Sequence, residues 1–160
     1  MAVGESQSGI IDSYLDATPR SRVAHERSVA VMPGGAKGAY HYAPYPVFFE
    51  SGDGCRLVDV EGRTLVDCAN HHTAQIVGHR HPAVMAAIEA QLKRGVVLGG
   101  PTGVETELAE ELCDRVESLE RVRFCNSGTE ATLHAIRLAR GVTGRPKIAK
   151  FEGGYHGSHD

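Results

Sequence analysis

Residues 122–154 read VRFCNSGTEATLHAIRLARGVTGRPKIAKFEGG, and the pattern of apolar side chains changes twice along this stretch. The apolar run at 122–125 predicts a strand, residues 129–140 have helical spacing, and the run at 147–151 predicts a second strand. A strand, a helix and a strand in succession form a βαβ unit, in which the two strands are parallel. The chain is therefore predicted to be an α/β protein with a parallel sheet.

The residues before this unit predict helices and a small antiparallel sheet. Apolar spacing favours helices over 10–17, 21–31, 82–95 and 102–116; Pro19 is expected to end the first, and Thr102 with Glu105 to form a capping box at the last. Three β-rich runs, at 46–50, 55–60 and 63–67, are separated by turn sequences and predict a three-stranded meander. We assign residues 1–75 to a small domain and residues 76–160 to the beginning of a larger one.

Composition narrows the class of protein. The 160 residues are 41% hydrophobic and 23% charged, with a formal net charge of −3. This is ordinary globular usage, and it leaves no basic excess for binding a nucleic acid. The N-terminus does not resemble a signal peptide, and no apolar run approaches the ~20 residues that span a bilayer. We therefore expect a cytoplasmic protein with neither nucleic acid nor membrane as a partner.

Cysteine and histidine give no clear metal or disulfide pattern. The four cysteines are far apart and are expected to be small buried hydrophobic residues. The histidines at 71–72, 79–81 and 156–159 have ligand-like spacing, but no thiolate or carboxylate set accompanies them at a matching spacing, so no metal site is predicted. Phosphate-loop, dinucleotide-binding and nucleophile-elbow motifs are missing from the sequence.

A short loop joins the first predicted strand to its helix and has two interpretations. Ser127 can cap the helix while Glu130 reaches back, which by itself predicts only a capping box. The functional interpretation adds that Gly128 lets a ligand approach the backbone, and that the N–H groups of Gly128 and Thr129 bind a phosphate at the helix N-terminus. Capping boxes are the more common of the two features.

The second candidate loop, residues 152–160, follows the second predicted strand. Because parallel strands deliver their carboxyl ends to one edge of a sheet, the two loops are expected to converge. Tyr155 offers a flat face on which a ring can stack, and His156 and Asp160 offer polar contacts. The alternative is a glycine-rich turn with an exposed tyrosine and solvated histidines.

Seven motifs occur in a fixed order along the chain. Together they resemble the class III aminotransferases of pyridoxal 5′-phosphate (PLP) fold type I, in the branch similar to glutamate-1-semialdehyde 2,1-aminomutase. The resemblance runs from about Pro33 to the last residue. The motifs are Met32-Pro33-Gly34-Gly35, Gly78-His79-Arg80-His81-Pro82, Pro101-Thr102 with Glu105, NSGTEA at 126–131, IRLAR at 136–140, TGR at 143–145 and FEGGYHG at 151–157.

The resemblance implies a homodimeric enzyme with PLP as its cofactor. In the family, the loop at the positions of Ser127, Gly128 and Thr129 holds the cofactor phosphate. The aromatic residue at the position of Tyr155 stacks on the pyridine ring, and His156 is expected to support that loop.

Two substrate-binding residues are also implied by the resemblance. His41 stands where the aminomutase has an arginine that receives the substrate carboxylate, and His72 stands in place of a tryptophan of the pocket. An imidazole is a weaker carboxylate partner than a bidentate guanidinium, so glutamate semialdehyde is not the expected substrate.

The family's chemistry also requires a Schiff-base lysine, which is expected beyond Asp160. None of Lys37, Lys93, Lys147 and Lys150 matches its position. The implied function is transfer of an amino group between an amine or amino acid and a carbonyl compound. A PLP-dependent aminomutase or amino-acid epimerase is the alternative within this chemistry, and a non-catalytic phosphate-binding or interaction module is the alternative outside it. On this resemblance, residues 1–75 are the N-terminal helix and antiparallel meander of a small domain, and residues 76–160 begin the PLP-binding large domain.

Overall fold

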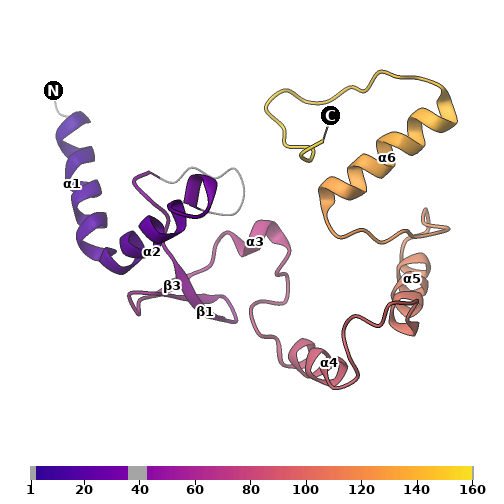
Figure 1. Cartoon of the computed structure of the whole chain (residues 1–160), viewed down its shortest axis with the longest axis horizontal. Helices are drawn as coiled ribbons and strands as arrows, with labels where there is room; N and C mark the ends of the chain where they lie inside the picture. Colours follow the sequence, from indigo (N-terminus) through magenta and orange to yellow (C-terminus); the bar gives the residue numbers. More distant parts are fainter. Residues whose placement is uncertain (1–2, 36–42, 160) are drawn as a thin grey trace. The chain divides into compact units, whose positions relative to one another are not determined.

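The structure is a computed structural model that describes residues 3–35 and 43–159. The chain forms two compact units, spanning residues 1–96 and 97–160 (Figure 1). The first unit holds α1 (Val3–Ala17), α2 (Pro19–Val29), a 3-10 turn η1 (Pro33–Gly35), the strands β1 (Phe49–Asp53), β2 (Arg56–Asp59) and β3 (Thr64–Val66), and the helices α3 (Asn70–Thr73) and α4 (Pro82–Leu92). The second unit holds α5 (Gly103–Arg115) and α6 (Gly128–Thr143). The assignment of domains to residues 1–75 and 76–160 stays a prediction.

Thr18 separates the first two helices, and a proline begins the second. Pro19 is the first residue of α2, where its missing N–H costs nothing because the first turn of a helix has no internal acceptor. The predicted second helix therefore starts two residues earlier than expected. Thr18, between the helices, is completely buried.

The three strands form the predicted antiparallel meander in the order β1-β2-β3. Asp53 pairs with Arg56 across the first turn, and Arg56 pairs with Val66 on the other side. The first strand begins at Phe49, three residues later than predicted. Phe48 donates its N–H to Ser21 Oγ at 3.2 Å, so this residue joins the meander to α2.

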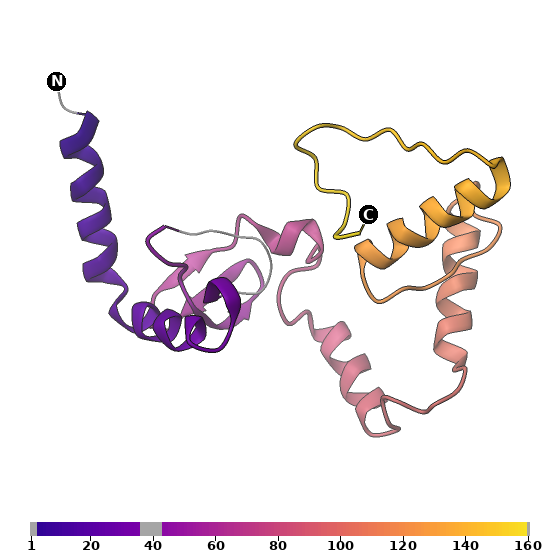
Figure 2. The same cartoon turned by 45° about the horizontal axis from the view of Figure 1, so that its top comes forward.

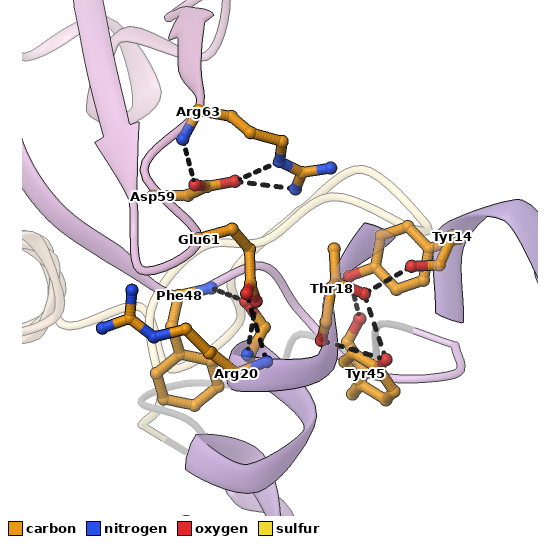
Figure 3. A network of polar contacts seen from close by, with 9 residues as sticks. Tyr14, Thr18, Arg20, Tyr45, Phe48, Asp59, Glu61 and Arg63 are labelled. Carbon is orange, nitrogen blue, oxygen red and sulfur yellow. Dashed lines mark hydrogen bonds and ion pairs between the residues drawn. The ribbon is translucent and has the colours of Figure 1, made fainter. Parts of the chain in front are cut away.

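A network of polar groups fastens α2 to the meander (Figure 3). Glu61, in the turn between β2 and β3, accepts hydrogen bonds from the backbone N–H groups of Arg20 and Ser21, at 3.2 and 2.7 Å. These groups belong to the first turn of α2, so a carboxylate distant in the sequence caps this helix. On the other side of the turn, Arg63 binds the fully buried carboxylate of Asp59.

The two predicted strands of the βαβ unit are wrong for the described residues. Neither 122–125 nor 147–151 joins a strand ladder, and the sheet in the described part of the chain is the antiparallel meander. A β-strand is defined by backbone hydrogen bonds to an adjacent strand, and these two segments do not pair with each other. The helix between them forms as predicted and extends to Thr143, where Gly144 ends it in the left-handed conformation.

Two further predictions are corrected. Thr102 precedes α5 but makes no side-chain capping hydrogen bond, so the capping box there does not form. The cysteines are free and not buried: Cys55 and Cys68 are exposed, and Cys113 and Cys125 are half-buried, because much of the apolar surface of the described residues is itself exposed. Among the described helices, none combines the length and apolar character needed to cross a membrane.

Candidate functional site

The N-terminus of α6 is organised by side chains that precede and begin the helix. Ser127 has extended backbone angles, and its Oγ accepts a hydrogen bond from the N–H of Glu130 at 3.1 Å. This half of the capping box is as predicted. Glu130 reaches back one residue further than a standard box, since Oε2 accepts from the N–H of Asn126 at 2.9 Å and from its Nδ2 at 3.3 Å.

This arrangement leaves a surface suited to an anion. The N–H groups of Gly128 and Thr129 belong to the first turn of a 16-residue helix, which supplies no internal acceptor for them. A Cβ placed on Gly128 would have no atom within 4 Å, so the backbone here is open to a ligand. The positive end of the helix dipole lies at the same place and favours negative charge.

The segment after α6 returns to the start of the helix, as Figure 2 shows in yellow. The hydroxyl of Tyr155 lies 3.4 Å from Thr129 Oγ1 and 3.0 Å from Ser158 Oγ, and the N–H of Ser158 donates to Thr129 Oγ1 at 3.2 Å. The structure thus brings together the two loops that the sequence singles out. The hydrogen bonds with Ser158 and Thr129 lower the pKa of Tyr155 below its ordinary value of 10.0.

Thr132 makes the second connection, and sequence reasoning missed it. Its Oγ1 lies 3.1 Å from the carbonyl oxygen of His156 and 3.0 Å from Nε2 of His159. A threonine in the second turn of a helix carries no local signal for such a role, because both partners come from residues about 25 positions away.

A hollow of about 580 Å³ lies between α6 and the returning segment. Thr132, Tyr155 and His156 line it, and so does Lys150. Lys150 was not among the expected site residues. It belongs to the segment predicted as a strand. Successive side chains of a strand point to opposite faces, so the sequence alone did not indicate which of them would line the hollow.

Two histidines are expected to face the substrate. His41 lies outside the described residues, and His72 belongs to the unit of residues 1–96. His72 is exposed on α3, where its ring centroid is 6.0 Å from that of His71. All four residues of α3 have positive φ, from 45° to 69°, so this element is a left-handed turn built without glycine. Such strained backbone is concentrated at functional sites, which makes α3 a candidate ligand-binding element.

A carboxylate and an imidazole hold the ends of the loop that contains α3. Asp67 Oδ2 lies 2.8 Å from His79 Nε2, while Asp67 Oδ1 accepts from the N–H groups of Ala69 and Asn70 at 3.1 and 2.8 Å. The hydrogen bond with His79 is the main cause of a lowered pKa at Asp67. The contact of His79 with Asp67 has no signal in the local sequence.

Comparison with known proteins gives one consistent family. The sequence matches the family of class III aminotransferases over residues 38–160. Glutamate-1-semialdehyde 2,1-aminomutase from Methanothermobacter thermautotrophicus is 46% identical over 142 residues, which are 88% of this chain and 34% of that protein. This chain spans about a third of the length of the curated relatives it matches.

Solved structures agree with this assignment. A structure described as a transaminase with PLP bound is 47% identical, with a TM-score of 0.85 over 89% of this chain and 34% of that one. A β-phenylalanine aminotransferase from Variovorax paradoxus is 35% identical, with a TM-score of 0.93 over 98% of this chain and 37% of that one. These matches confirm the family resemblance and the fold class that it implied, helices and a small antiparallel meander that match part of the PLP-dependent aminotransferase fold. The chain belongs to the class III aminotransferase family.

Proposed function

We propose that this chain supplies the phosphate loop and an aromatic wall of a PLP site, in an enzyme that transfers an amino group between an amine or amino acid and a carbonyl compound. The observation that carries the proposal is the connection of the α6 N-terminus to Tyr155 through Thr129 and Ser158. PLP, when bound, supplies an electron sink for amino-group chemistry.

The residues present fit a phosphorylated aromatic cofactor. The N–H groups of Gly128 and Thr129, preceded by the Ser127 cap, would hold phosphate oxygens at the positive end of the α6 dipole. Tyr155 has its hydroxyl anchored while its side chain is 78% exposed, so the ring is available for stacking. His156 would support this loop, since its carbonyl oxygen is within hydrogen-bonding distance of Thr132.

We propose that His41 and His72 act on the substrate side. An imidazole pair in place of arginine and tryptophan favours a substrate other than glutamate semialdehyde. An aminomutase is the second candidate function, because a protein of that name is 46% identical to 88% of this chain. The family resemblance also supports a homodimer, and we propose a cytoplasmic location for the protein.

The phosphate loop is tested by Gly128→Val in titrations with PLP followed by absorbance. The open surroundings of Gly128 accept the larger side chain, so a loss of affinity would report blocked approach of the ligand. Charge-assisted hydrogen bonds are worth ~1.5–3 kcal/mol each, so we expect PLP affinity to fall about 10-fold to 100-fold. Gly141→Val, in the same helix and equally open surroundings, is the matched control and should leave affinity unchanged. Equal affinity in both variants would reduce the loop to a helix cap.

The substrate assignment needs a chain of the relatives' length. We suggest a chimera in which this chain replaces the matching part of the Methanothermobacter thermautotrophicus relative. His72→Trp in that chimera should change the ranking of kcat/KM among amino donors while PLP affinity stays constant. An unchanged donor ranking would assign His72 a structural role.

A further inference from the structure

A thiol, a carboxylate and an imidazole lie together at the start of α6. They belong to Cys125, Glu130 and His134, and one ligand atom of each lies within 4.8 Å of the other two. We propose that this cluster binds Zn²⁺ as a three-ligand site separate from the proposed amino-transfer function. Histidine spacing in the sequence does not reveal this cluster, because its single histidine is joined by a cysteine outside the helix.

The local backbone explains why these side chains meet. Glu130 and His134 are four residues apart on α6 and so lie one above the other on the same face of the helix. The same i, i+4 spacing places both metal ligands of helical zinc sites such as H-E-x-x-H. Cys125 approaches from the non-helical segment just before the N-cap Ser127.

The distances are close to those of a tetrahedral site. Glu130 Oε1 and His134 Nε2 are 3.6 Å apart. Zinc bonds of ~2.0–2.1 Å to oxygen and nitrogen place two such ligands about 3.3 Å apart, and a Zn–S bond of ~2.3 Å places sulfur about 3.6 Å from either. The side chains of His134 and Glu130 are 46% and 38% exposed, so they are free to change rotamer. Movements of about 1 Å are sufficient to bring the three ligand atoms to the distances of a zinc site.

Hydrogen bonds from a neighbouring residue already orient the carboxylate of Glu130. Asn126 donates two hydrogen bonds to Oε2 of Glu130, while Oε1 faces His134. Outer partners of this kind fix ligand orientation in metal sites.

Charge balance favours a divalent cation over a monovalent one. A cysteine thiolate and an ionised Glu130 carry two negative charges, and a neutral His134 adds none, so a divalent ion gives a neutral complex. A neutral complex avoids the repulsion that the positive end of the α6 dipole would exert on a net cation. Sulfur and nitrogen donors select zinc over magnesium or calcium, and the fourth position of the tetrahedron stays open for water.

The test is a titration of the purified chain with Co²⁺, a spectroscopic substitute for Zn²⁺, followed by competition with Zn²⁺. We expect one ion per chain, a thiolate-to-cobalt charge-transfer band, and displacement by Zn²⁺. Cys125→Ser should abolish the band, and His134→Ala should weaken binding at least tenfold. Alanine favours the helix at this exposed position, and helix content by circular dichroism verifies that α6 persists.

Matched variants make the result decisive. Cys113→Ser changes an equally half-buried cysteine in α5 and should bind Co²⁺ as the parent chain does. Gly128→Val should also keep the metal, so loss of PLP binding and loss of metal binding are separate results. The proposal is overturned if no thiolate band appears, or if Cys125→Ser and Cys113→Ser bind with equal affinity, as scattered adventitious binding would require.

Discussion

The hydroxyl of Thr132 lies between α6 and the segment that carries Tyr155. Its Oγ1 contacts the carbonyl oxygen of His156 and the ring of His159, and it also contacts the carbonyl oxygens of Gly128 and Thr129 in its own helix. Since the two contacts outside the helix hold the returning segment, removing the hydroxyl should loosen residues 153–159. We expect Thr132→Val to speed amide hydrogen exchange in that segment about fivefold, which corresponds to one hydrogen bond of about 1 kcal/mol. Thr132→Ser keeps the hydroxyl and should match the parent chain. Equal protection in the valine variant would mean that other contacts hold the segment.

The carboxylate of Asp67 gives the loop 67–79 a predictable response to acid. Its pKa is lowered chiefly by the hydrogen bond with His79 and also by the N–H groups of Asn70 and Ala69. A lowered pKa in the folded state means that the contribution to stability is present above the ordinary pKa of ~3.9 and is lost as the pH falls through the lowered value. The Asn70 amide signal in NMR should therefore titrate below about pH 4. In Asp67→Asn that inflection should vanish; its persistence would assign it to another group.

At the scale of single residues, the predicted cap at Ser127 forms, the predicted cap at Thr102 does not, and the distant contacts could not be predicted. Ser127 was identified because a cap and its helix are adjacent in the sequence. The Thr132 and Asp67 contacts join residues that are distant in the sequence. They depend on the path of the chain between these residues, and no repeating pattern in the sequence predicts them. The cluster of Cys125, Glu130 and His134 could be predicted only in part. The spacing of Glu130 and His134 shows that they share a helix face, but the direction of Cys125 depends on the turn before the helix.

Among the elements, α3 was the least predictable from the sequence, because all four of its residues have positive φ. Thr73 is β-branched and has φ of 69°, a conformation that costs L residues roughly 1–2 kcal/mol. Thr73→Gly removes this cost but adds about 0.5–1 kcal/mol of chain entropy, so the turn should gain slightly in stability. We expect amide exchange of Gln75, which donates to the Asn70 carbonyl, to slow by about twofold to fivefold.

The neighbouring residue provides the control for this prediction. Ala74 has φ of −77°, so Ala74→Gly relieves no strain and should only add chain entropy. Exchange of Gln75 should become faster in that variant. If both glycine variants speed exchange, the left-handed turn is not under strain.

Helices were easier to predict than strands for a physical reason. The apolar spacing of α4 and α6 is a property of the segment itself, and both helices form where that spacing predicted them. The meander was also predictable, because short turns bring its strands together. The segments 122–125 and 147–151 have strand-like composition but lack a pairing partner in the described residues, and composition cannot supply one.

At the scale of the whole molecule, the distribution of buried side chains sets the stability. Among the described residues, the buried hydrophobic side chain is Tyr45, whereas Thr18, Ser21 and Asp59 are completely buried and polar. The apolar stripes of the helices are exposed: Ile88 and Leu92 on α4, and Val104 and Leu108 on α5, each have about half of their surface in contact with solvent. Hydrophobic burial is the dominant favourable contribution to folding, so the described part of the chain uses little of its apolar surface for stability.

This exposure predicts how the chain behaves alone and how it should change inside a longer protein. Exposed apolar faces bind hydrophobic dyes and promote association, so the chain should bind anilinonaphthalene sulfonate, self-associate in light scattering, and unfold without a sharp transition. The chimera described above spans the relative's full length, and we expect the part of the relative that this chain does not match to cover these faces. Dye binding per chain should therefore fall and unfolding should become cooperative. A monomeric chain that unfolds sharply and binds no dye would show that these helical faces are stable in contact with water, and would remove the physical reason for expecting them to be covered.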